Sequence, residues 1–201
     1  MKPNQLLTQE EISHLALTNG YDPASLKAVL EVESAGHGFS SVTGKIIIQF
    51  EPAWFKRKAL DWQKHNTNTI WQNNGISNQA QEWLAFNDAW KVSPDAAMQS
   101  TSIGLPQIMG FHYRLLGFKQ VGEMWDFAKV SEANQVAMMI KFIKANPKLD
   151  TALKNDDWGT FAYIYNGAGY KELAARTKTM PYDKRLAVAK AQIIKEISNN
   201  A

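Results

Sequence analysis

A glutamate on an otherwise apolar helix face is the side chain in this sequence with the clearest capacity for acid–base chemistry. Glu33 follows Leu26, Val29 and Leu30 at the i, i+3, i+4, i+7 spacing that places residues on one helix face. Glu31 points about 140° away from that stripe. Burial disfavours a carboxylate, so the pKa of Glu33 is expected to rise, as a general acid at neutral pH requires. By position alone, a helix-end glutamate that hydrogen-bonds nearby backbone is the more ordinary interpretation.

Three further segments place polar side chains beside glycine or other small residues. They are Ala35–Phe39, which follows directly after Glu33 and Ser34, then Thr101–Gly110, and finally Phe161–Gly169. Taken singly, each is weak evidence, because the second fits an ordinary turn and the third an ordinary helix end. Their order along the chain carries more information than any one of them.

Together and in this order, the segments resemble the lysozyme-like superfamily of goose-type lysozymes and soluble lytic transglycosylases. In that superfamily a Glu-Ser pair ends a helix, a Gly-Leu-x-Gln-Ile-Met segment follows, and a Tyr-Asn segment closes the cleft. The chain more specifically resembles the phage endolysin N-acetylmuramidase family. The motifs that carry this resemblance are Val32–Phe39, Ile48–Pro52, Gln107–His112 and Phe118. The resemblance spans roughly residues 22 to 170.

The resemblance implies a function and a set of site residues. Glu33 would be the catalytic acid that cleaves the β-1,4 bond between MurNAc and GlcNAc in peptidoglycan, without a metal or cofactor. The sugar-binding cleft would include Ser34, Gln107, Tyr165 and Asn166, and dipoles near Ser102 and Gln107 would help to place water. Two positions depart from the family: Ile103 stands where an aromatic residue is common, and Pro106 where a small one is.

The second carboxylate of such a mechanism is expected to be Glu51. There is no Asp or Glu between Glu33 and Glu51, so Glu51 is the only candidate if the segment after the acid supplies a partner. On strand alternation it shares a face with Ile47 and Gln49, opposite Ile46, Ile48 and Phe50. Glycoside hydrolysis commonly uses two carboxylates. A purely structural carboxylate favoured by a helix N-terminus is the alternative for Glu51.

Three other functions remain open at this stage. A lytic transglycosylase would use the C6 hydroxyl of the substrate in place of water and give 1,6-anhydroMurNAc products. A non-catalytic peptidoglycan-binding module and a structural component of a phage particle are the others. The position of Glu33 on a buried face argues against these last two.

The sequence predicts that the segments carrying these residues are mainly helical. Capping signals predict helices from Thr8 to Gly20 and from Pro23 to about Ser34, another from Pro52, and later starts near Ser77, Ser93, Ser131, Asp156 and Tyr182. The segment from Phe39 to Phe50 is rich in β-branched residues and predicts a small β-hairpin, with its turn at Thr43–Lys45. We therefore expect a mainly α (α+β), lysozyme-like fold of about eight or more helices, forming one domain over residues 1–201.

Composition limits the remaining possibilities. Of 201 residues, 45% are hydrophobic and 20% charged, which is typical of a folded globular chain. The absence of cysteine excludes disulfides and thiol catalysis, and the four histidines show no metal-ligand spacing. The first ten residues lack the apolar core of a secretory signal. With the family resemblance, this implies accumulation in the host bacterial cytoplasm until lysis, followed by action on the cell wall.

The positive charge gathers at the C-terminal end. Residues 171–201 hold 7 Lys and Arg against 3 Asp and Glu, whereas residues 1–170 hold 15 against 16. A basic amphipathic helix is expected at about 182–197, whose apolar side more plausibly packs on the core. Its basic side predicts binding to anionic envelope surfaces, with a solvated helix face as the plainer interpretation. Peptidoglycan glycan strands are the expected partner, nucleic acid is not, and a monomer is expected.

Overall fold

The computed structural model describes residues 6–34, 37–65 and 76–199, which are mainly helical and include a three-stranded antiparallel sheet. This confirms the fold class expected from the sequence. The chain forms two compact units, one from residues 37–138 and the other from residues 7–34 together with 139–199. Within the described residues, no helix combines the length and apolar character needed to cross a membrane.

The first unit is built on the small sheet. Strand β1 (Ile48–Phe50) pairs with β2 (Thr101–Ile103), and β2 pairs with β3 (Ile108–Met109), all antiparallel. The predicted hairpin exists as a single bridge between Phe39 and Ile46, with its turn at residues 41–43 rather than at 43–45. The strand partner of β1 lies some fifty residues further along the chain, so local sequence patterns do not reveal it.

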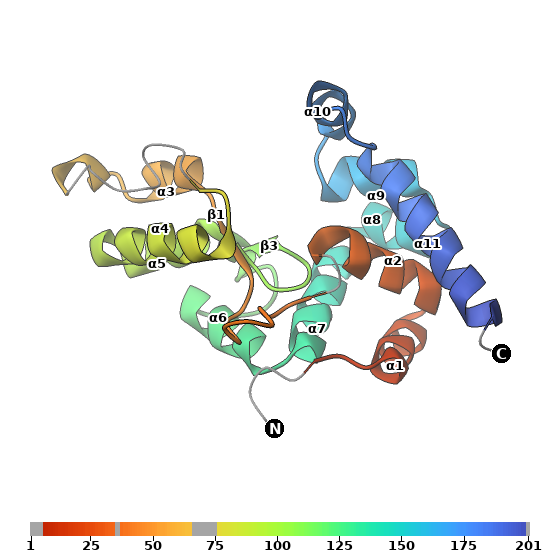
Figure 1. Cartoon of the computed structure of the whole chain (residues 1–201). Helices are drawn as coiled ribbons and strands as arrows, with labels where there is room; N and C mark the ends of the chain where they lie inside the picture. The colour runs from red at the N-terminus through yellow and green to blue at the C-terminus, as the bar shows by residue number, and fades with distance from the viewer. Residues whose placement is uncertain (1–5, 35–36, 66–75, 200–201) are drawn as a thin grey trace. The chain divides into compact units, whose positions relative to one another are not determined.

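Helices make up most of the rest of this unit. The unit contains α3 (Pro52–Lys58), η1 (Trp62–Lys64), α4 (Gln79–Val92), α5 (Pro94–Gln99), η3 (Gly110–His112), α6 (Val121–Val130) and the beginning of α7 (Glu132–Lys144). Helices α4 and α5 lie side by side (Figure 1). Between them and α6, the rings of Phe86 and Trp125 stack with centroids 4.9 Å apart, and Trp83 meets Trp125 edge-on. These aromatic contacts form the core that fixes α4.

The second unit begins with two capped helices. Helix α1 (Gln9–Asn19) opens with the Thr8–Glu11 capping box and ends at Gly20, whose φ is +80°. Helix α2 (Pro23–Ser34) starts after Asp22, whose carboxylate accepts the Ser25 backbone N–H at 2.9 Å. Both helices have the bounds that the sequence predicted. The same unit contains α8 (Pro147–Lys154), α9 (Trp158–Tyr165), α10 (Tyr170–Thr177) and α11 (Tyr182–Asn199).

Helix α11 runs antiparallel to α2. Its start contacts the end of α2, whereas Ile193 near its other end packs on Ala24 and Ala28 at the start of α2 (Figure 1). Leu186 and Ile193 are fully buried, which confirms that the apolar side of this helix packs on the core. The stripe is shorter than expected, because Ile194 and Ile197 are each about half exposed.

An ion-pair network ties α11 to the rest of the unit. The Lys190 ammonium lies 2.5 Å from Asp156 and 3.5 Å from Asp22, and the Ser25 hydroxyl donates to Asp156 at 2.6 Å. Asp156 holds a left-handed backbone conformation with φ +54°. The network joins the start of α2, the turn before α9 and the middle of α11, so Lys190 is not a freely solvated charge.

Three helices were not predicted. Helix α6 begins with a Gln120–Glu123 capping box, and α8 begins with Asn146 followed by Pro147. These signals have the same form as those that located α1 and α2. The start of α10 has no side-chain cap in the structure.

Candidate active site

Glu33 lies at the end of α2, where the apolar face of the helix meets α11. Leu26, Val29 and Leu30 of the same face are buried. Glu33 itself is partly accessible, and burial of its carboxyl raises the pKa to about 7, with opposing effects from Tyr182 and Arg185. The group therefore exists as a mixture of acid and carboxylate near neutral pH, which suits a proton donor.

Tyr182 is the closest described partner of this carboxyl group. Its hydroxyl donates a hydrogen bond to Glu33 Oε1, and the ring is buried at the start of α11. One turn later, the Arg185 guanidinium donates to the Val32 carbonyl at 2.9 Å. The Tyr182 hydrogen bond and the positive charge of Arg185 both favour the ionised form of Glu33, so they limit the effect of burial on its pKa. Helical start signals alone indicated Tyr182, and they gave no sign of this contact.

Tyr165 belongs to the same cluster. Burial, with the charge of Glu33 adding to it, raises the pKa of Tyr165 well above the usual range, and the Tyr165 ring stacks on Phe161 with centroids 5.1 Å apart. The ring also meets Phe142 edge-on at 5.7 Å. Asn166 ends α9 next to it and is exposed. The structure thus brings Glu33, Tyr165 and Tyr182 together, with Asn166 at the adjacent helix end.

Ser34, a predicted sugar-binding residue, is the last residue of α2, and its side chain lies outside the described part of the chain. Its role stays a prediction.

Ser102 and Gln107 meet in the other unit. The Ser102 hydroxyl donates to Gln107 Oε1 at 2.9 Å, and Gln107 Nε2 donates to the Gly104 carbonyl at 2.7 Å. Gln107 has a left-handed backbone conformation with φ +47°, which for a residue with a side chain is uncommon and costs free energy. The Gly-Leu-Pro-Gln turn therefore holds the amide in one orientation by two side-chain bonds and its own backbone.

Glu51 stands between β1 and α3, as predicted. It is the N-cap residue of α3 and makes no side-chain capping bond, and its position at the helix N-terminus remains compatible with a structural carboxylate favoured by the helix dipole. Gln49 Nε2 donates to Glu51 Oε1 at 2.9 Å, and Gln49 is exposed while Ile48 and Phe50 are buried. This confirms the predicted alternation of faces. Burial raises the pKa of Glu51.

A further carboxylate, that of Glu82 on α4, accepts a backbone hydrogen bond from the segment that leads into Glu51. Glu82 Oε2 accepts the Phe50 backbone N–H at 2.7 Å, one residue before Glu51. Burial is the main cause that raises the Glu82 pKa, and the negative charge of Glu51 adds to it. On the same helix, Gln79 accepts the Ile48 N–H and donates to the Ile48 carbonyl. Glu82 and Gln79 thereby occupy the free edge of β1 and fix the backbone that leads into Glu51.

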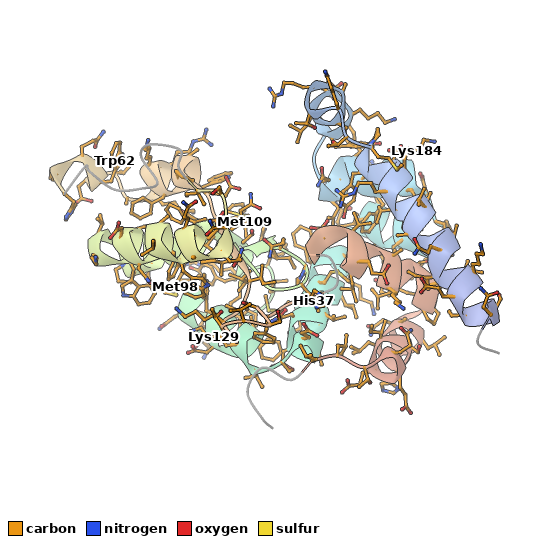
Figure 2. All side chains as sticks on the ribbon, viewed as in Figure 1. His37, Trp62, Met98, Met109, Lys129 and Lys184 are labelled. Atoms are coloured by element: carbon orange, nitrogen blue, oxygen red, sulfur yellow. The ribbon has the colours of Figure 1, made fainter. Side chains whose placement is uncertain are left out.

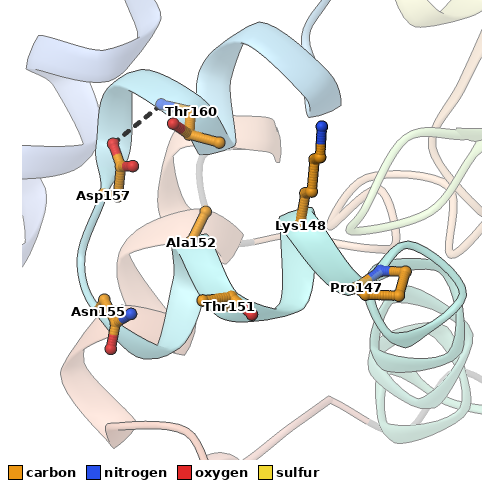
Figure 3. A pocket seen from close by; sticks show the side chains of 7 residues that line it. All are labelled: Pro147, Lys148, Thr151, Ala152, Asn155, Asp157 and Thr160. Atoms are coloured by element: carbon orange, nitrogen blue, oxygen red, sulfur yellow. Dashed lines mark hydrogen bonds between the residues drawn. The ribbon is translucent and has the colours of Figure 1, made fainter.

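A hollow of about 390 Å³ also lies where α8 meets α9 (Figure 3). Asp157, which lines it, accepts the Thr160 N–H at 3.0 Å and so caps α9. None of the site residues predicted from the sequence is among those lining the hollow. The described residues also contain no cluster of three or more His, Cys, Asp or Glu side chains arranged for a metal.

Comparisons with known proteins agree on one relationship. Residues 22–193 match the N-acetylmuramidase family. The fold is similar to the crystal structure of a Burkholderia AP3 phage endolysin, with 31% sequence identity, a TM-score of 0.78, and coverage of 96% of this chain and 72% of that one. No curated protein matches the chain.

Proposed function

Because the chain belongs to the N-acetylmuramidase family, we propose that Glu33 is the general acid of its glycosidase reaction. The protein is a peptidoglycan hydrolase of the endolysin type. Its substrate class is the glycan of peptidoglycan, in which the bond between MurNAc and GlcNAc is cleaved. The observation that supports Glu33 best is the contact of its carboxyl with Tyr182 in a buried setting that raises its pKa to about 7.

The proposed reaction begins with proton transfer. Protonated Glu33 donates to the glycosidic oxygen, and the bond between this oxygen and C1 of MurNAc breaks with development of an oxocarbenium-like centre. Water adds to C1, and its proton passes to a carboxylate, for which Glu51 is the candidate. The dipoles of Ser102 and Gln107 are proposed to orient substrate or water, and Ser34, Tyr165 and Asn166 to contact the sugar. The product carries a reducing-end MurNAc.

The mass of the released muropeptides tests this function. We expect reducing-end MurNAc products, which borohydride reduces. A lytic transglycosylase would release 1,6-anhydro products that are lighter by one water and resist borohydride. A digest dominated by anhydro products would overturn hydrolysis while leaving Glu33 as the acid, and intact glycan strands would overturn both.

Tyr182→Phe is expected to shift the alkaline limb of the activity profile to higher pH. The Tyr182 hydroxyl stabilises the Glu33 carboxylate, so its loss raises the pKa of Glu33 above about 7. A hydrogen bond to a charged group is worth about 1.5–3 kcal/mol, so the limb should move by about one pH unit or more. The measurement is kcat/KM against pH on soluble glycan strands. A lower rate without a shift of the alkaline limb would mean that Tyr182 contributes only packing, and not the ionisation of Glu33.

We further propose that the basic side of α11 strengthens binding to anionic envelope surfaces. Lys184 (Figure 2) and Lys195 are exposed, whereas Lys190 is held by two aspartates and Arg185 by the Val32 carbonyl. The double change Lys184→Gln and Lys195→Gln therefore tests surface charge without disturbing those contacts.

This double variant should bind whole cell walls about two- to thirtyfold more weakly at low salt, because two exposed ion pairs at about 0.2–1 kcal/mol each are lost. The difference should shrink at high salt. Neutralising Lys119 and Lys129 of the other unit gives the same change in net charge and serves as the control in a sedimentation assay. Equal loss in both double variants would mean that only net charge matters.

A further inference from the structure

A groove of about 340 Å³ lies within the first unit, between the turn that joins Phe39 to Ile46 and helix α4. Thr43 and Lys45 line it from the turn, and Trp83, Leu84 and Asn87 line it from α4. None of the residues assigned above to acid catalysis or to sugar contact lines this groove.

The walls of the groove are held in place by contacts behind them. Trp83 packs edge-on against Phe86 at 5.5 Å and against Trp125 at 6.4 Å, so its ring is fixed by the aromatic core. The turn is closed by two backbone bonds, from Ser40 to the Lys45 carbonyl and from Gly44 to the Ser40 carbonyl, each of 2.8 Å. A groove with fixed walls is available to a ligand without a large ordering cost.

The surface of the groove combines apolar area with one positive charge. The Lys45 ammonium lies 5.1 Å from the centre of the Trp83 ring. Within the described residues, no carboxylate forms a salt bridge with Lys45. Leu84 is 58% exposed beside them, although it is a large apolar side chain. A ligand that fits would present a carboxylate to Lys45 and small apolar groups to Trp83 and Leu84.

Peptidoglycan contains one component with that chemistry. Its glycan is uncharged where the lactyl group of MurNAc is amidated, whereas the attached peptide carries carboxylates and alanine methyl groups. We propose that this groove binds the peptide stem of peptidoglycan, with a stem carboxylate on Lys45 and the alanine methyls on Trp83 and Leu84. The inference rests on the proposed function, because it takes peptidoglycan as the substrate, and it names a recognition element apart from the bond that is cleaved.

Calorimetry with two glycan preparations tests the proposal in the Glu33→Gln protein, which should bind without cleaving. One preparation is soluble uncross-linked strands that carry stems, and the other is the same strands after an amidase has removed the stems and each freed lactyl carboxylate has been converted to its uncharged methylamide. We expect the stem-bearing strands to bind about two- to fivefold more tightly at low salt, the range for one exposed ion pair. Adding Lys45→Gln should remove that preference, and Leu84→Asp should do the same by repelling the stem carboxylate.

Lys91→Gln is the matched control, because Lys91 lies on α4 outside the groove and pairs with Asp88 at 3.0 Å. It should keep the preference for stems. Equal affinity of the Glu33→Gln protein for both preparations would overturn the proposal. So would an equal loss with Lys45→Gln on both preparations, since the groove would then bind glycan rather than stem. Cleavage of stem-free strands by the parent protein reports separately on the proposed function, so the two ideas fail independently.

Discussion

Replacing Glu33 by Gln is expected to abolish nearly all wall-degrading activity. The change removes the proposed proton donor and almost no volume, and general acid catalysis typically contributes about 10²- to 10⁴-fold. We expect kcat/KM on purified peptidoglycan to fall by a factor in that range, measured by the release of reducing ends. Activity near that of the parent would refute the assignment of the acid.

Glu31→Gln is the matched control for this result. Glu31 lies two residues earlier on α2, and its carboxylate is 3.7 Å from the Lys27 ammonium on a more exposed face. It can lose its charge at the cost of one partly exposed ion pair, which contributes little to stability. The variant should therefore keep its activity, and a loss comparable to that of Glu33→Gln would point to damage of α2 rather than to chemistry.

Glu33→Gln should also change how the stability of the protein depends on pH. The pKa of Glu33 is raised from about 4.5 to about 7 in the folded protein. The folded state therefore holds its proton more tightly than the unfolded state, and the parent loses stability as pH rises from about 4.5 to 7. Glu33→Gln lacks this contribution, so its free energy of unfolding should fall less over the same interval. Denaturant titrations at both pH values measure the difference.

Replacing Glu51 by Gln is expected to lower turnover by about 100-fold or more while glycan binding persists. The reason is that a neutral amide cannot accept the proton of the attacking water. A general base at this position typically raises the rate by at least about 10²-fold. Initial rates and affinities on soluble strands separate the two effects. Unchanged turnover would leave Glu51 with a structural role only.

Stability distinguishes a catalytic loss from a folding defect in this variant. Burial raises the pKa of Glu51, and its charge acts against that of Glu82, so ionisation of Glu51 costs stability at neutral pH. Glu51→Gln should therefore be at least as stable as the parent at pH 7, by thermal unfolding. Asp126→Asn, which removes a mostly exposed carboxylate in the same unit, is the control for loss of one carboxylate.

Burial of Glu51 also predicts the acid side of the parent's pH profile. Its pKa is raised, so the fraction of ionised Glu51 should decline at a higher pH than for an ordinary glutamate. Together with loss of the Glu33 proton above about 7, this gives a bell-shaped dependence whose two limbs belong to different residues.

Much of the helical framework and the candidate acid followed from the sequence because both depend on nearby residues. The capping box at Thr8, the Asp22–Pro23 start and the Ser93–Pro94 start each use residues within one turn of the helix that they begin. The burial of Leu26, Val29 and Leu30 on the helix face that leads to Glu33 likewise follows from helical periodicity alone. Alternation placed Gln49 and Glu51 on one face for the same reason.

The partners of these residues were decided only by the tertiary structure. Tyr182 reaches Glu33 across 149 positions of sequence, and Glu82 reaches the Phe50 N–H across 32. The pairing of β1 with β2 joins residues more than fifty positions apart, which turned an expected hairpin into part of a three-stranded sheet. No local periodicity encodes such contacts, because they depend on how amphipathic helices pack, and packing is set by the whole core. The sequence by itself therefore determined which helix face carries Glu33, and the fold decided which groups set its proton affinity.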